Sequence, residues 1–149
     1  MKRPLSLLSA LLAAISLNAH AAPGCFNVAG DIARQTGNRL DRQELTEVLQ
    51  SLSRSGQLPP KFVNKKQARA AGWQPGRSLW SVPALQGKSM GGDRFGNYEK
   101  RLPAGQWQEA DLGYKGGKRG AYRLVFSRQG QRYVSVDHYN RFIEVPPCQ

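Results

Sequence analysis

The sequence predicts an α+β domain in which N-terminal helices pack on a C-terminal antiparallel β-sheet. Apolar residues recur at helical spacing in the first half of the chain, before residue 72. Short runs with β-strand character follow residue 87. Glycine-containing turns separate these runs, at Gly91-Gly92, Gly116-Gly117 and Gln129-Gly130. An order of helices first and strands second is typical of this fold class.

The strongest helix prediction begins after Asp41. Asp41 and Glu44 have the spacing of a capping box, in which Asp41 caps the helix and Glu44 reaches back to it. Gly56 ends the helical pattern. Before it, apolar residues recur at helical spacing, at Leu45, Val48, Leu49 and Leu52. A weaker pattern predicts an earlier helix over residues 28–36.

A second short helix is predicted to start at Asn64. Asn64 and Gln67 form another capping-box pair, and Gly72 is a good terminator. Lys65 falls in the first turn, where its charge opposes the helix dipole. It is therefore either a solvated lysine or a cation directed at a phosphate together with the helix N-terminus. Residues 74–87 are predicted to form a loop with one helical turn near residues 79–82.

The strands are predicted over residues 88–90, 107–111, 122–127, 132–137 and 142–145. Trp73 and Trp107 are predicted to lie in the core. Asp93, directly after the glycine pair, is predicted to cap a turn there. Asp111 and Asp137 are predicted to be structural residues that pair with arginines or turn amides.

The N-terminus has the features of a secretory signal peptide. Lys2 and Arg3 precede an apolar run over residues 5–17, and small residues follow at 19 and 21. The expected cleavage point is after Ala21, with Ala22 as the alternative, and the apolar run is too short for a spanning helix. We therefore expect a protein secreted to the periplasm or the extracellular space, monomeric and without membrane attachment once residues 1–21 are removed.

The chain is strongly cationic, with a formal net charge of +12. Residues 1–21 carry two of the 22 basic residues and none of the ten acidic ones, so the mature chain of 128 residues has a charge of +10. Such a charge favours nucleic acid, phosphorylated polymers or anionic membranes as partners. The basic residues are dispersed rather than clustered in one block, which predicts a folded basic face.

The two cysteines stand at opposite ends of the mature chain, at Cys25 and Cys148. In an exported protein an even pair of cysteines predicts a disulfide. It would tie an N-terminal extension, residues 22–40, to the C-terminus of the domain formed by residues 41–149.

Four residues of the last third suggest chemistry on a phosphodiester, namely Glu109, Arg119, Arg123 and His138. A carboxylate can take a proton, an imidazole can return one, and guanidiniums hold a phosphate. This set needs no cofactor or metal. Taken singly, each residue is also compatible with an ordinary surface or hydrogen-bonding role.

Several short segments in order resemble the barnase and binase family, the secreted bacterial ribonucleases with guanine preference. They cover residues 57–59, 64–73, 87–95, 99–103, 107–111 and 137–139, together with Arg119 and Arg123. The resemblance extends over about residues 45–145 and leaves out both cysteines. It implies the microbial ribonuclease fold, with residues 41–149 as the ribonuclease domain.

The resemblance also implies metal-independent cleavage of single-stranded RNA on the 3′ side of guanosine. Glu109 would be the general base and His138 the general acid, giving a 2′,3′-cyclic phosphate that water opens to a 3′-phosphate. Arg119, Arg123 and Lys65 would stabilise the phosphoryl charge. Tyr139 would support the phosphate or the adjacent base.

Base recognition is implied for the loop that contains Phe95, Asn97, Tyr98 and Glu99. Glu99 stands where the family has a glutamate that accepts from the guanine ring N–H and exocyclic amine. Gly96 replaces the usual serine and Tyr98 the usual arginine, which puts the strength of guanine preference in question. Tyr98 would either stack on a base or simply cover the loop.

Two further expectations concern partners and activity. The resemblance implies a small acidic inhibitor of the barstar type, whose carboxylates would mimic RNA phosphates. The alternative function is a catalytically inactive, cationic nucleic-acid-binding protein, which would bind RNA and DNA in a salt-sensitive manner without forming a cyclic phosphate.

Overall fold

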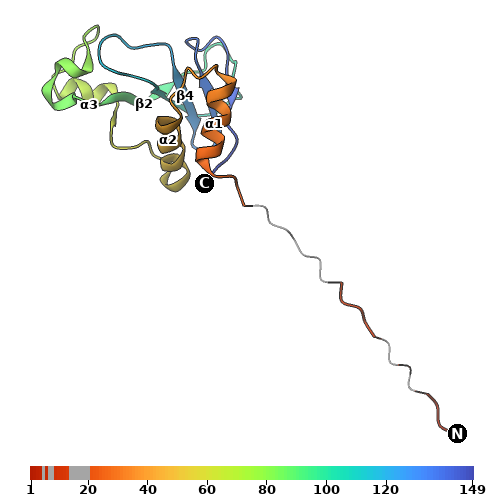
Figure 1. Cartoon of the computed structure of the whole chain (residues 1–149). Helices are drawn as coiled ribbons and strands as arrows, with labels where there is room; N and C mark the ends of the chain where they lie inside the picture. The colour runs from red at the N-terminus through yellow and green to blue at the C-terminus, as the bar shows by residue number, and fades with distance from the viewer. Residues whose placement is uncertain (5, 7–8, 14–20) are drawn as a thin grey trace.

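The computed structural model describes residues 1–4, 6, 9–13 and 21–149. The expected signal segment, residues 1–21, lies partly outside these residues. Within the described part of the chain, no helix is both long enough and apolar enough to cross a membrane. The folded body begins with helix α1 and ends at the C-terminus beside it (Figure 1).

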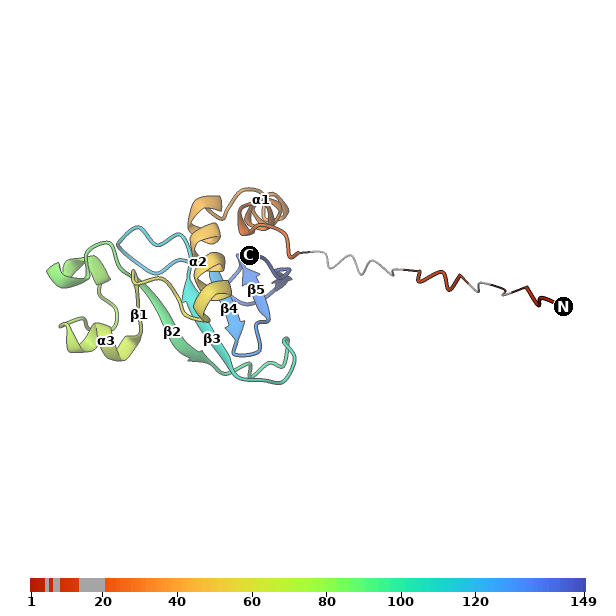
Figure 2. The same ribbon diagram turned by 90° about the horizontal axis from the view of Figure 1, so that it is seen from below.

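Two helices form the N-terminal layer, α1 over Cys25–Gln35 and α2 over Arg42–Ser55. They lie side by side against the middle of the sheet (Figure 2). The four apolar residues predicted for α2 are all buried, which confirms the helical pattern. Helix α1 starts three residues before the predicted 28–36 segment, because Cys25 is drawn into the same core as Val28 and Ile32.

The two ends of α2 confirm part of the capping pattern predicted from the sequence. Asp41 caps the helix by accepting the Glu44 backbone N–H at 2.8 Å, and Gly56 ends it at φ 70°. The predicted return bond from Glu44 to Asp41 is wrong. The Glu44 carboxylate instead accepts from Lys61 Nζ at 2.6 Å and from the Gly113 N–H at 2.7 Å. A full charge and a loop amide are better partners than one exposed amide of the same turn.

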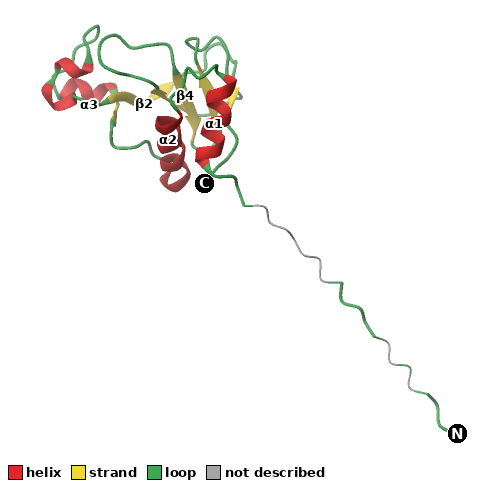
Figure 3. Ribbon diagram, in the orientation of Figure 1, coloured by secondary structure: helices red, strands yellow, loops and turns green. Residues whose placement is uncertain are grey.

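The sheet has six strands in the order β1 to β6. Figure 3 shows the strands in yellow and the helices in red. They cover Phe62–Val63, Ser89–Phe95, Trp107–Asp111, Arg123–Ser127, Arg132–Ser135 and Ile143–Glu144. The five strands predicted from the sequence are antiparallel neighbours, as expected. Strand β1 was not predicted, and it pairs with β2 in parallel. Two residues are too few for a periodic signal, so only the tertiary contact with Ser89 and Met90 defines it.

Strand β2 contradicts the prediction of a turn at Gly91-Gly92. It runs from Ser89 through both glycines to Phe95, with a register shift between Gly91 and Asp93. A Cβ on Gly91 would lie 2.6 Å from the Phe62 ring, so this glycine permits close packing of β1. The glycine pair therefore forms a bulge inside a strand rather than the end of one.

Helix α3, over Lys65–Ala70, has the predicted capping box between Asn64 and Gln67. Asp93 does not cap a turn in its own segment. Its carboxylate accepts the backbone N–H of Lys65 at 3.0 Å and so caps α3 from strand β2. Two 3₁₀ helices follow, the predicted one over Leu79–Ser81 and an unpredicted one over Pro83–Leu85. Trp73 is buried beneath this region, as expected.

The faces of the central strands have different roles. Ala110 and Leu124 point into the core beneath the helices, and the alternate residues of β3 and β4 point to the opposite face. On that opposite face, Trp107 and Val125 form a small apolar cluster at one end. Glu109 lies on the same face, so the fold places this carboxylate away from the helical layer.

The predicted disulfide between Cys25 and Cys148 is present, with an S–S distance of 2.10 Å. The backbone of Cys25 also donates to the carbonyl of Gln149 at 2.9 Å. Both cysteines belong to the main core, so the disulfide joins α1 to the C-terminus within the apolar interior and not at the surface.

Candidate active site

Glu109 is half-buried at the middle of β3. The hydroxyl of Tyr139 donates to its Oε2 at 2.7 Å. Burial raises the pKa of Tyr139, and the bond to the Glu109 carboxylate raises it further. The phenol is therefore a protonated donor throughout the neutral range, and it fixes the orientation of the carboxylate.

Two arginines are held next to this carboxylate by Asp111, two residues further along β3. Asp111 is 3% exposed and accepts from Arg119 Nε and Nη2, both at 2.7 Å. Its other contact is Arg123 Nε, 3.2 Å from Oδ1. The bond to Asp111 is the main reason that the pKa of Arg119 is raised, and the charge of Glu109 contributes. The prediction that Asp111 pairs with arginines is confirmed.

Arg123 is almost fully buried and is fixed on several sides. Its Nη1 donates to the carbonyls of Gly120 and Tyr122 at 2.8 and 2.9 Å. Its guanidinium carbon lies 5.7 Å from the centre of the Tyr139 ring. The cation is thus held rigidly beside the Tyr139–Glu109 pair, as charge stabilisation of a reacting phosphate requires.

Asp111→Ala is expected to lower the free energy of unfolding by about 3–5 kcal/mol, because it leaves two cations without their buried partner. Urea denaturation of the variant and the wild type measures this. The matched control is Asp31→Ala, because the exposed Asp31–Arg34 pair should contribute about 0–1 kcal/mol. Equal losses in the two variants would contradict the assigned role of Asp111.

His138 and Tyr139 are presented by a tight turn after β5. Both have left-handed backbones, with φ of 53° and 70°. Asp137 stabilises the turn as predicted, since its Oδ1 accepts from the Arg141 N–H and the Ser135 hydroxyl, both at 2.9 Å. Unfavourable φ values in residues other than glycine are held by such bonds, and they are common at functional sites.

The variant Asp137→Asn tests whether the Asp137 carboxylate stabilises this turn, through the pH dependence of its Tm. The backbone N–H of Arg141 is the main cause that lowers the pKa of Asp137, with Ser135 contributing. A lowered pKa means that the stabilisation is present above the unfolded pKa of about 3.9 and is lost as pH falls through the folded value. The Tm deficit of the variant should therefore be largest at neutral pH and shrink below about pH 4. A deficit independent of pH would count against this role.

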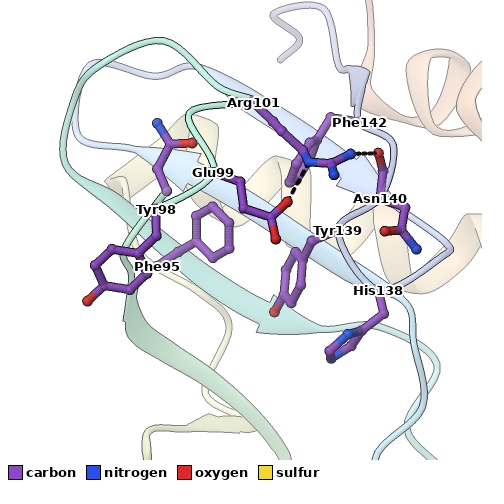
Figure 4. A pocket seen from close by; sticks show the side chains of 9 residues that line it. Phe95, Tyr98, Glu99, Arg101, His138, Tyr139, Asn140 and Phe142 are labelled. Carbon is purple, nitrogen blue, oxygen red and sulfur yellow. Dashed lines mark hydrogen bonds and ion pairs between the residues drawn. The ribbon is translucent and has the colours of Figure 1, made fainter.

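A pocket of about 240 Å³ opens beside the turn (Figure 4). It is lined by Phe95, Asn97, Tyr98, Glu99, Arg101, His138, Tyr139, Asn140 and Phe142. All four residues predicted for base binding line it, together with His138. The centres of the Phe95 and Tyr139 rings lie 4.9 Å apart with their planes tilted by 32°, which gives the pocket an aromatic wall. Glu109, Arg119 and Arg123 do not line it, and Tyr139 is the residue that connects the pocket with the carboxylate.

The pocket loop is fixed by its own polar side chains. Asn97 donates to the carbonyl of Leu102 at 2.9 Å and accepts its N–H at 3.1 Å, so its side chain closes the loop. Glu99 accepts from Arg101 Nε at 2.7 Å, and Arg101 also donates to the carbonyl of Asn140. Sequence reasoning missed Arg101, although a cation two residues after a candidate recognition carboxylate is a usable signal.

Tyr98 and Gly96 form a matched pair within this loop. Tyr98 is 89% exposed. A Cβ on Gly96 would lie 2.3 Å from Cε2 of the Tyr98 ring, so the ring rests directly against the glycine. Any side chain at position 96 would displace the tyrosine, and the two departures from the family pattern are therefore physically coupled.

Lys65 is half-buried, and its described contact with the site is indirect. The carboxylate that accepts its backbone N–H belongs to Asp93, which lies opposite Glu109 in the β2–β3 register. The structure thus places the start of α3 near the strand that carries Glu109. It shows no hydrogen bond or ion pair of the Lys65 ammonium within the described residues.

Comparison with known proteins identifies the family of the chain. The ribonuclease family model matches residues 47–146. A ribonuclease from Heyndrickxia coagulans is 41% identical over 97 residues, which are 63% of this chain and 88% of that relative. Ribonucleases from Bacillus intermedius and Bacillus pumilus are each 41% identical over 97 residues, and the match spans 59% of their length. The chain therefore belongs to the ribonuclease family.

Proposed function

We propose that this protein is a secreted, metal-independent endoribonuclease that cleaves single-stranded RNA on the 3′ side of guanosine. One observation carries the proposal: Tyr139 binds Glu109 through its hydroxyl and lines the pocket that holds His138. A base, an acid and a nucleoside-sized pocket are thus joined through one side chain, next to two arginines anchored by Asp111.

The first step is a transfer within the RNA strand. Glu109 takes the proton of the ribose 2′-hydroxyl, which attacks the adjacent phosphorus. Its Oε2 is engaged by Tyr139, and Oε1 has no hydrogen bond among the described residues, so Oε1 is the oxygen assigned to this proton. His138 protonates the departing 5′-oxygen. The products are a 2′,3′-cyclic phosphate and a new 5′-hydroxyl.

The second step reverses the two roles. His138 removes a proton from water, the water attacks the cyclic phosphate, and Glu109 protonates the departing 2′-oxygen. The final product is a 3′-phosphate. Arg119 and Arg123 stabilise the charge on the phosphoryl oxygens in both steps, an effect of about 10²–10³-fold for each well-placed donor. Lys65 is proposed as a third, more distant cation.

Guanine preference is assigned to Glu99. Its carboxylate can accept from the ring N–H and the exocyclic amine of guanine, a pair of donors that adenine and the pyrimidines lack on one edge. In the described structure this carboxylate is 73% exposed and paired with Arg101, so it faces solvent at the pocket rim. The arginine orients it, and the aromatic wall supplies a stacking surface.

The direct test is cleavage of the dinucleotides GpC, ApC and UpC by the mature protein in the presence of EDTA. We expect GpC to be cleaved fastest, with guanosine 2′,3′-cyclic phosphate appearing before the 3′-phosphate. A strict metal requirement would overturn the mechanism. RNA binding without any cyclic product would instead favour the inactive, cationic nucleic-acid-binding alternative.

Secretion is proposed on the signal features of residues 1–21 together with the disulfide, since stable disulfides form in oxidising compartments. We propose cleavage after Ala21 and a ribonuclease domain over residues 41–149. Mass spectrometry of the exported protein tests whether cleavage occurs after Ala21.

An acidic inhibitor that covers the basic site is proposed as a protective partner. Loss of GpC cleavage on mixing with an acidic co-encoded protein would support it.

A further inference from the structure

A second opening lies directly beside the base pocket and shares Phe95 with it. It is a groove of about 420 Å³. Its lining residues are Gly92, Arg94, Phe95, Gly96, Gly105, Gln106, Trp107, Gln108 and Arg128. The set contains two cations and two amide side chains but no carboxylate, so the groove has the character of an anion site.

The two arginines of the groove differ from those of the active site. Arg94 and Arg128 are both exposed. Neither guanidinium makes an ion pair or a side-chain hydrogen bond with any residue that the structure describes. By contrast, Arg101, Arg119 and Arg123 are each bound to a carboxylate. The groove arginines therefore keep all their donors for a ligand, and phosphate is a good match for guanidinium donors.

The groove extends around the end of β2, because both Arg94 and Phe95 line it and Phe95 also lines the pocket. Arg94 and Phe95 are consecutive strand residues, so their side chains point to opposite faces of the sheet. Strand β1 pairs only with Ser89 and Met90, which leaves this end of β2 without a neighbour on its outer side. Gly96 follows at the edge, and the exposed Tyr98 ring rests against it. A nucleic-acid strand can thus pass from pocket to groove over a glycine and beside an aromatic ring.

The direction of that strand rests on the proposed function. His138 protonates the departing 5′-oxygen, so the RNA on the 3′ side of the cut leaves at the His138 end of the pocket. Figure 4 shows Tyr98 at the other end of the lining side chains, with Phe95, Glu99 and Tyr139 between them. The part of the RNA on the 5′ side of the bound guanosine is therefore the part that meets Tyr98 and then the groove.

We propose that the groove is a subsite for the phosphodiester backbone of RNA on the 5′ side of the cleaved nucleotide. Arg94 and Arg128 bind its phosphates, and Tyr98, resting on Gly96, stacks on the base that precedes the guanosine. The natural substrate is then a single strand that extends upstream of the cut, and a dinucleotide uses only part of the binding surface.

The test compares three substrates: GpC, GpC extended by a short uridine tract on the 5′ side, and the isomer extended on the 3′ side. For the wild type, kcat/KM should be higher for the 5′-extended substrate than for GpC. The double variant Arg94→Ala/Arg128→Ala should abolish most of that advantage. It should also reduce the salt dependence of kcat/KM for the 5′-extended substrate, by about 0.7 per lost contact in the log–log slope.

Tyr98→Ala should lower the advantage of the 5′ extension by about fivefold or more, and Tyr98→Phe should retain it, because stacking needs the ring and not the hydroxyl. The charge-matched control is Arg54→Ala/Arg77→Ala, which removes two exposed arginines that line neither opening. Thermal denaturation of each variant shows whether it is folded.

Three results would overturn the subsite: an unchanged ratio of 5′-extended to GpC cleavage in the groove variant, an equal loss on the 3′-extended isomer, or an equal loss in the control. Binding of a 5′-extended oligonucleotide with 2′-deoxyguanosine, followed by fluorescence anisotropy, separates this proposal from the catalytic one. If the wild type cleaves nothing, the catalytic proposal fails, and weaker binding by the groove variant would still support the subsite.

Discussion

Glu109→Gln is expected to lower kcat/KM for GpC by about 10²–10⁴-fold, which is the usual contribution of a positioned general base. The glutamine has nearly the same shape, and its amide oxygen can still accept from Tyr139, so the site should keep its geometry. What is lost is the capacity to take the 2′-hydroxyl proton. Steady-state kinetics should show that the loss lies in kcat, because Glu109 does not line the pocket that is proposed to bind the base.

The pH profile distinguishes the base from a merely structural carboxylate. A general base must be deprotonated, so the acidic limb of kcat/KM for the wild type should disappear in Glu109→Gln. His138→Ala should lose the alkaline limb for the corresponding reason. Glu144→Gln, at an exposed residue of β6, is the control and should leave the profile intact. A Glu109→Gln variant with a full acidic limb would contradict the assignment.

Loss of the disulfide is expected to have the largest effect on stability. The bond joins residues that are 123 positions apart, so it restricts nearly the whole mature chain in the unfolded state. Loop-closure entropy then gives an upper limit of about 4–5 kcal/mol for Cys25→Ser/Cys148→Ser. The two sulfurs also lie within the main core, and serine hydroxyls placed there would lose apolar contacts.

Urea denaturation of the wild type with and without a reducing agent should show the same decrease as the double variant. The reducing agent should have no effect on the variant, which serves as its own control. Cleavage of GpC should persist under conditions where the variant is folded, because both cysteines lie in the core beneath the helices and Glu109 lies on the opposite face. A decrease below about 1 kcal/mol would show that the unfolded chain retains structure that replaces the constraint.

The elements that sequence could predict are those with a strong local cause. The strand over residues 107–111 was predicted with its observed bounds, because turn residues flank it, with Gly105 before it and Gly113 after it. The capping box at Asn64 is confirmed for a similar reason, since its partners are three residues apart. The predictions for Glu44 and Gly91 were wrong, because distant segments decide their structural roles. The Glu44 carboxylate accepts from the backbone N–H of Gly113, and Gly91 packs against the Phe62 ring.

For the candidate site, sequence provided residue types and their order but not their contacts. The sequence alone determined a helix-then-strand α+β domain, the cysteine pair and the cationic charge, and it indicated the candidate catalytic residues and the loop predicted to bind the base. Only the tertiary structure decided that Tyr139 holds Glu109, that Asp111 clamps two arginines, and that Tyr98 rests on Gly96. These contacts join side chains from different strands and loops. The distances between these side chains depend on how the strands and loops pack together. Residue patterns that extend over a few positions of the sequence do not determine that packing.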